Sequence, residues 1–172
     1  LNWSCTKSHN SVTRGFYFWQ SNLSSNTLNS GRLDSLNIES LYIKFFDVTI
    51  DEASQQPIPV ADISFEQPVP ANISIIPVVF ITNNTLENLD TIQCKYLAQK
   101  IAKRIQYIID TNNLALPTEI QIDCDWTTTT RQNYFILLQT IKQYPTFNKV
   151  QISSTIRLHQ IKYYKTTGVP PV

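Results

Sequence analysis

The feature that most constrains the fold of this chain is the alternation of strand-like and helix-like segments. Two runs, residues 40–48 (SLYIKFFDV) and 74–82 (SIIPVVFIT), are almost continuously apolar, as is typical of strands covered on both faces. Three further strand patterns occupy residues 15–20, 119–126 and 149–160. Because helical segments intervene, the strands are predicted to form a mainly parallel sheet of the α/β class.

Two of the connections between these strands carry a helical pattern. Asp90 is suited to cap a helix over residues 91–110, and Gln93 stands at the position that completes a capping box. A second helix is predicted to open at Thr129 and to end at Pro145. Each helix has apolar residues along one side, which predicts that it packs against the sheet.

The segment from residue 51 to residue 72 breaks this pattern. It contains four prolines and no helical period, so we expect an excursion there in place of a crossover helix. Within it, residues 60–66 (VADISFE) could form a short extra strand. Another connection is predicted to hold at most a short helix, around residues 29–36.

Two architectures fit five parallel strands. One is a (β/α)8 TIM-type barrel of about 250 residues, of which this chain would supply about the first five strands. The other is an open, doubly wound α/β sheet, which five strands could complete. The chain has no methionine and ends in the loop-like TGVPPV, so we expect a fragment of a longer product, which favours the barrel. Residues 15–172 would then be the N-terminal portion of the barrel domain.

Residues 1–14 are predicted to be a flexible N-terminal tether. Cys5 precedes a polar stretch rich in Ser, Thr, Lys and Asn, as does the lipidated first residue of a mature bacterial lipoprotein. The alternative is an ordinary cysteine in an unstructured end. Lipidation would place the protein in the cell envelope, at the outer membrane or in the periplasm. We expect membrane contact only through that anchor, because no apolar run is long enough to span a bilayer.

Composition and motifs argue against several classes of function. The net charge is +1 and no basic stripe is present, so no nucleic-acid partner is expected. With three glycines there is no phosphate-binding loop, and no Cys/His spacing suits zinc, so we expect no cofactor and no metal. Cys94 and Cys124 fall in a helix pattern and a strand pattern and are predicted to be buried free thiols.

Two acids, Asp123 and Asp125, end the strand predicted over residues 119–126. They share one face of that strand with Gln121, while the alternate residues face the helices. Barrel enzymes place their sites at this end of the strands. We therefore predict Asp125 as the ligand-facing catalytic residue and Asp123 as a second candidate catalytic acid that is paired with a basic residue. The structural alternative is that Asp123 neutralises a buried lysine and Asp125 caps the following loop.

Basic residues on other strands are the candidate partners of these acids. Lys44, Arg157 and His159 are predicted to share the face of the acids, and a buried carboxylate needs such a partner. We expect Lys44 or Arg157 to pair with Asp123, and all three basic residues to be candidate ligand contacts. Each also has a structural interpretation: Arg157 as an ordinary ion-pair partner and His159 as a packed neutral imidazole.

Three more residues near strand ends complete the candidate site. Trp19 and Gln20 end the first strand and could stack on, or hydrogen-bond to, a sugar. Asp47 ends the second strand, where it is either a second acid at the mouth or a loop cap, and we favour the cap.

Four blocks of sequence carry a resemblance to a known family. They are SLYIKFFDV, IIPVVFITN, IQIDCDWT followed by R-x-x-YF-x-LL, and STIRLHQIKY ending in TGVPPV. Together they resemble a family of uncharacterised bacterial lipoproteins of the Bacteroidetes type, from Phe16 to the end of the chain. The resemblance implies a glycoside-hydrolase-like (β/α) barrel that continues beyond this sequence.

The sequence Asp123-Cys-Asp125-Trp-Thr127 has a more distant likeness. It is similar to the Asp-x-Asp-x-Glu of chitinase-type glycoside hydrolases, in which the glutamate is the acid. Thr127 stands at the glutamate position, and a threonine cannot protonate a leaving group. The likeness therefore implies that the acid role has moved, for example to Asp125, or that the reaction is a different one.

These observations leave more than one function open. The first hypothesis is a carbohydrate-active envelope lipoprotein, a candidate glycoside hydrolase, with Asp125 as acid or nucleophile. The second is a non-catalytic glycan-binding or structural envelope protein on the same scaffold. A third is a small-molecule enzyme on an open α/β sheet. The fold alone does not choose among them, since barrels host many functions.

Overall fold

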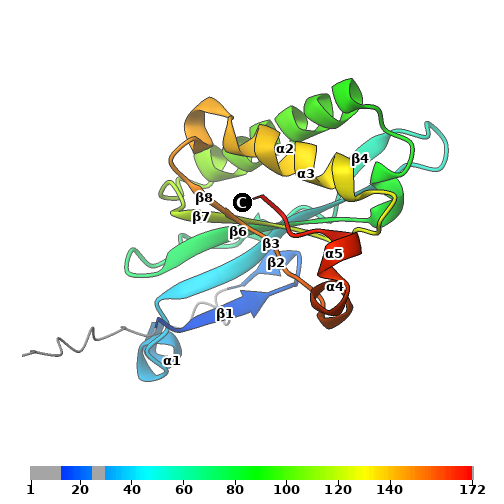
Figure 1. The fold of residues 1–172 in the computed structure, drawn as a ribbon. Coiled ribbons are helices and arrows are strands. Elements are labelled where there is room, and N and C mark those ends of the chain that lie inside the picture. Colours follow the sequence, from blue (N-terminus) through cyan, green and yellow to red (C-terminus); the bar gives the residue numbers. More distant parts are fainter. Residues whose placement is uncertain (1–12, 25–29, 172) are drawn as a thin grey trace, which may run out of the picture.

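The computed structural model describes residues 13–24 and 30–171, and the predicted lipidation site Cys5 and most of the predicted tether lie outside these ranges. The described chain forms one mixed α/β unit (Figure 1). In chain order, its elements are β1 (Gly15–Phe18), β2 (Asn22–Leu23), α1 (Ser30–Ser35), β3 (Ser40–Ile50), β4 (Pro57–Val60), β5 (Ser64–Phe65), β6 (Ser74–Ile81), η1 (Asn83–Leu86), α2 (Thr91–Thr111), β7 (Glu119–Cys124), α3 (Arg131–Lys142), η2 (Pro145–Phe147), β8 (Gln151–Ser153), α4 (Leu158–Lys162) and α5 (Tyr164–Thr167).

The central sheet is mostly parallel, which confirms the predicted α/β class. Its strands lie in the order β1-β3-β6-β7-β8, and all of these neighbours are parallel. β4 adds an antiparallel edge beside the C-terminal half of β3. Strand order follows chain order, so the described strands contain no reversal of the kind found at the switch point of a doubly wound sheet.

Helices α2 and α3 lie side by side and cover one face of this sheet (Figure 1). The start of α2 is as predicted, because Asp90 Oδ1 accepts the Gln93 backbone N–H and Gln93 Oε1 accepts the Asp90 backbone N–H, both at 2.8 Å. The N-cap of α3 is Thr130, one residue later than predicted, and α3 ends at Lys142 before the predicted stop at Pro145.

The apolar core fills the space between these two helices and the sheet. The Tyr134 hydroxyl of α3 donates to the Ile122 carbonyl oxygen of β7 at 2.6 Å, which fixes the helix against the strand. Burial of each large apolar side chain contributes about 1.5–3 kcal/mol. Fully or almost fully buried residues of this layer include Leu97, Ile101, Ile105, Ile120, Ile122, Cys124, Trp126, Tyr134, Leu137 and Leu138.

The proline-containing connection after β3 holds no helix, as predicted. It contributes β4 and β5 instead, and β5 pairs with β2 in a separate two-stranded ribbon. Phe65 of β5 meets Phe45 of β3 edge to face, with 6.3 Å between ring centroids. An ion pair between Asp62 and Arg104 ties the same connection to α2.

The prediction of a strand over residues 149–160 is wrong beyond its first part. β8 ends at Ser153, and the chain then turns into the short helix α4. Arg157 and His159 therefore leave the sheet, with Arg157 as the N-cap of α4 and His159 exposed within it.

The buried side chain of Gln160 accounts for this turn. Its Oε1 accepts the Arg157 backbone N–H at 2.8 Å, and its Nε2 donates to the Trp126 carbonyl oxygen at 3.2 Å. Only 1% of Gln160 is exposed, so loss of either bond would leave a buried polar group unpaired. These bonds hold residues 157–160 in a helical turn that the alternating pattern of the sequence does not reveal.

A bulge in β3 shifts the alternation of its side chains. The pairing of β3 with β6 changes register between Lys44 and Phe46, and the adjacent Phe45 and Phe46 are both buried. Phe46 consequently lines the space under α2, whereas strict alternation predicts it on the face of the acids. Asp47 takes that place, beyond the bulge and on the same side as Lys44.

Candidate functional site

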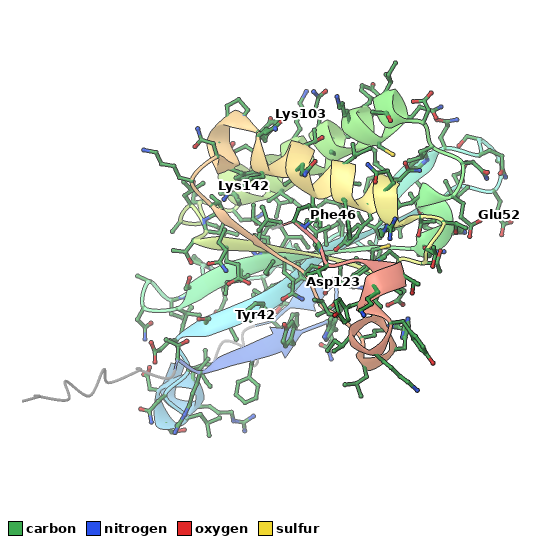
Figure 2. The ribbon with its side chains drawn as sticks, viewed as in Figure 1. Tyr42, Phe46, Glu52, Lys103, Asp123 and Lys142 are labelled. Atoms are coloured by element: carbon green, nitrogen blue, oxygen red, sulfur yellow. The ribbon has the colours of Figure 1, made fainter. Side chains whose placement is uncertain are left out.

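The face of the sheet turned away from α2 and α3 carries polar side chains from four strands, and we call it the polar face. On β7, Gln121 and Asp123 alternate with Ile122 and Cys124, which belong to the core under the helices. As predicted, Gln121 and Asp123 share a side, and Figure 2 shows Asp123 and Tyr42 on the opposite side of the sheet from Phe46. The polar face consists of Tyr17, Tyr42, Lys44, Asp47, Glu119, Gln121, Asp123 and Ser153.

A chain of hydrogen bonds crosses the polar face and ends on Asp123. The Tyr17 hydroxyl donates to Gln121 Oε1 at 2.8 Å, and Gln121 Nε2 donates to Asp123 Oδ2 at 2.7 Å. The other carboxylate oxygen of Asp123 accepts from the backbone N–H and the hydroxyl of Thr155, at 3.0 and 2.8 Å. Gln121 and Asp123 are only 3% and 4% exposed, so these bonds satisfy groups that water hardly reaches.

The bond between Tyr17 and Gln121 also indicates that the sheet is curved. Their strands, β1 and β7, are separated by β3 and β6, which is about 14 Å across a flat sheet. A direct bond over that distance is the contact expected where a sheet curls toward this face. Ile76 and Val78 of β6 lie between the two residues in register and are buried at 5% and 0% exposure.

Aromatic rings lie at one side of this network. The rings of Tyr17 and Tyr42 stack with centroids 4.7 Å apart, and the ring of Trp19 lies parallel to that of Tyr17 at 6.1 Å. Tyr17 and Trp19 are each 49% exposed, so both present ring surface to solvent. Partial burial raises the pKa of the Tyr17 and Tyr42 phenols, which keeps them protonated as hydrogen-bond donors.

Lys44 is part of the polar face, but its partner is not the one predicted. Its Nζ donates to Asp47 Oδ2 at 2.8 Å, and both side chains are mostly buried. The expected pairing of Lys44 or Arg157 with Asp123 is wrong, because Thr155 and Gln121 already satisfy that carboxylate. Asp47 is thus an ion-pair partner within the face, and the sequence pattern had favoured a loop cap.

Asp125 lies just beyond β7, at the carboxyl edge of the sheet. It forms an ion pair with Arg157, and both side chains are more than a third exposed. The structure thus brings together Asp125 and Arg157 at the edge, with Asp123 buried behind them. His159 and Gln20 are exposed near the same strand ends, and their ligand contacts stay predictions.

Three residues of the site carried no clear signal in the sequence. Tyr17 and Thr155 fall within predicted strands without a motif that marks them, and Tyr42 lies in an apolar run. Tyr17 and Trp19 are two residues apart, and that spacing on a strand could have indicated a shared exposed face. The bond from Tyr17 to Gln121 joins residues 104 positions apart, and local pattern cannot reveal it.

The two described cysteines are poor candidates for nucleophilic chemistry. Cys94 and Cys124 are buried free thiols, as predicted. Burial raises the pKa of Cys94 to about 11 and that of Cys124 to about 12, so little thiolate forms near neutral pH.

Across residues 13–24 and 30–171 no cluster of three or more His, Cys, Asp or Glu could hold a metal ion. The helices of this part of the chain are all too short or too polar to cross a bilayer.

The chain matches no protein-family model, and no curated protein matches its sequence.

Proposed function

We propose that the polar face binds a carbohydrate, in a non-catalytic envelope protein. The observation that carries this proposal is the parallel, half-exposed pair of Tyr17 and Trp19 beside a hydrogen-bonded polar network. Sugars present an apolar ring face and a rim of hydroxyls, so they bind where an aromatic surface and polar groups adjoin. Tyr17 supplies both, since its ring is exposed and its hydroxyl is held by Gln121.

The finer architecture belongs to the same proposal. Strands in chain order, with α2 and α3 on one face and polar residues on the other, suit the first five strands of a (β/α)8 barrel. The bond from Tyr17 across two strands to Gln121 supports a sheet that curls toward its polar face. On this proposal, the polar face is the interior of the barrel and Asp125 lies at its carboxyl mouth.

The envelope location rests on the sequence alone. Cys5 would be the lipidated residue and residues 1–14 the tether between lipid and domain. Intact-mass measurement of the native protein tests this directly, because acyl chains on Cys5 add mass to the N-terminal peptide. A Cys5→Ser variant should lose that added mass and leave the membrane fraction.

The contacts of the acids favour binding over hydrolysis. A general acid must reach the leaving group of its substrate, and the Asp125 carboxylate is engaged in an ion pair with Arg157. Asp123 accepts three hydrogen bonds within the protein, which leaves it little capacity for a substrate. Both acids therefore suit a fixed role in shaping a ligand site.

Hydrolysis of a glycan is the second candidate, and the position of Asp125 favours it. A partly exposed carboxylate at the carboxyl edge of a parallel sheet could act as a nucleophile or base. Replacement of Asp125 with Asn separates the two functions. A hydrolase should lose turnover by orders of magnitude and keep its affinity, whereas a binder should show only a modest change in affinity.

The experiment that tests binding is titration calorimetry with chitohexaose, together with a glycan array to widen the search. Trp19→Ala should weaken the affinity about five- to thirtyfold, since loss of one stacking surface costs on the order of 1–2 kcal/mol. Tyr107→Ala is the matched control, because Tyr107 is an exposed aromatic residue on α2. Equal affinities for the two variants would contradict the proposal.

A further inference from the structure

A small apolar slot lies on the other side of the sheet, between α2 and the edge strand β4. Its volume is about 160 Å³. The floor is Phe46 and Val48 of β3, one wall is Pro57, Ile58 and Pro59 of β4, and the other wall is Leu97 and Ile101 of α2. Figure 2 shows Phe46 on this side of the sheet, under the helices.

Two cationic side chains stand at the rim of this slot. Lys100 and Arg104 follow Leu97 and Ile101 on the same side of α2, because residues three, four and seven apart share one side of a helix. Arg104 pairs with Asp62. Lys100 makes no ion pair with the described carboxylates, and its Nζ lies 4.5 Å from the centroid of the Tyr96 ring.

One polar group near Lys100 lacks a hydrogen-bond partner. The Arg104 Nε–H is buried and has no acceptor among the described residues. A second hollow, of about 60 Å³, lies beside Lys100, shares Pro57 and Leu97 with the slot, and is lined by the amides of Gln56 and Gln93. An ammonium group without a carboxylate partner, and an arginine whose Nε–H lacks an acceptor, therefore border a slot whose other walls are apolar.

We infer that this slot binds a small amphipathic anion, namely a carboxylate on a short apolar tail. A dry apolar cavity of about 150 Å³ is large enough for benzene, so the slot accommodates one ring or a tail of roughly six carbons. The carboxylate would meet Lys100 at the rim, while the tail lies between Ile58 and Ile101. Charge complementarity selects the anion, and the apolar walls select the tail.

The site is built to need little rearrangement on binding. Two prolines on β4 restrict the backbone of the outer wall, and an edge strand is a position that tolerates proline. The opposite wall belongs to the long helix α2, which is tied to the connection after β4 by the ion pair of Arg104 and Asp62. A preformed site of this kind loses less conformational entropy when the ligand binds.

The test uses hexanoate as the probe, with hexan-1-ol and hexylammonium as matched ligands of the same tail. Calorimetry should give a Kd on the order of 1 mM or tighter for hexanoate, at least a tenfold weaker value for hexanol, and no binding of hexylammonium. In methyl NMR spectra, hexanoate should shift the signals of Val48, Ile58 and Ile101. Absence of hexanoate binding, equal binding of the alcohol, or shifts confined to other methyl groups would each overturn the inference.

Two charge variants on the same helix sharpen the test. Lys100→Gln keeps an amphipathic side chain but removes the rim charge. It should weaken the affinity for hexanoate at least tenfold and leave the affinity for hexanol unchanged. Lys103→Gln removes an exposed charge that does not line the slot, so it should bind hexanoate as the unaltered protein does. Equal weakening by both variants would mean a general effect of helix charge and would overturn the site. Neither outcome bears on the carbohydrate proposal, which concerns the opposite face.

Discussion

The two faces of the central sheet are built on different principles. Under α2 and α3, β7 contributes Ile120, Ile122 and Cys124 to a layer held by apolar packing. On the polar face the same strand contributes Gln121 and Asp123, which are equally buried but held by directed hydrogen bonds. The same strand thus belongs to two layers. In the apolar layer side chains can shift slightly without losing their contacts, and on the polar face each polar group bonds to a particular partner. The second kind of layer is where specific ligand recognition can develop.

The largest expected effect is on the helix-covered face. Ile122→Ala removes a fully buried side chain next to α3 and should lower the free energy of unfolding by about 2–5 kcal/mol, because it leaves a cavity. Urea denaturation measures this value. Ile92→Ala is the control: Ile92 is 78% exposed on α2, and its loss should change stability by less than about 0.5 kcal/mol. Similar values for both variants would contradict the assigned core.

A smaller effect is expected on the polar face. Asp123→Ala leaves the Gln121 amide and both donors of Thr155 without their acceptor and should lower the free energy of unfolding by about 1–3 kcal/mol. The same denaturation experiment applies, with Glu52→Ala as an exposed acidic control. If Asp123→Ala were as stable as the unaltered protein, the network would not hold the face together.

The smallest effect is expected at the carboxyl edge. Asp125 and Arg157 form an exposed ion pair, and such pairs contribute about 0.2–1 kcal/mol. A double-mutant cycle with Asp125→Ala and Arg157→Ala measures their coupling, which should decrease further as salt is added. A coupling that is larger and insensitive to salt would place the pair inside the buried network of the polar face.

Much of the fold could be predicted from the sequence because local signals agree with the tertiary structure. The apolar runs at residues 40–48 and 74–82 and the capping box at Asp90 form strands and a helix as expected. Prediction failed where a single side chain decides the backbone. Gln160 bonds to Arg157 and Trp126 and so ends the fifth strand early, although the polar and apolar residues there still alternate.

The candidate site was predicted less completely than the fold. Asp123 and Gln121 were assigned to the correct face, since alternation on a regular strand is reliable. The predicted pairing of Asp123 with Lys44 or Arg157 was wrong, because the sequence shows the charges of these residues but not the distances between them. The contacts that define the site, from Tyr17 to Gln121 and from Thr155 to Asp123, join distant parts of the chain and depend on the completed sheet.

The bulge in β3 has a consequence for any comparison of this chain with its relatives. One additional residue at Phe45–Phe46 exchanges inward and outward positions for the rest of the strand. A homologue that keeps both phenylalanines but forms a regular strand there would place its aspartate in the apolar layer and its second phenylalanine beside Lys44, whereas a homologue that lacks one of the two phenylalanines would keep the aspartate beside Lys44. Whether a relative keeps the acidic side chain on the polar face is therefore decided by the bulge, and residue identity alone is not a guide.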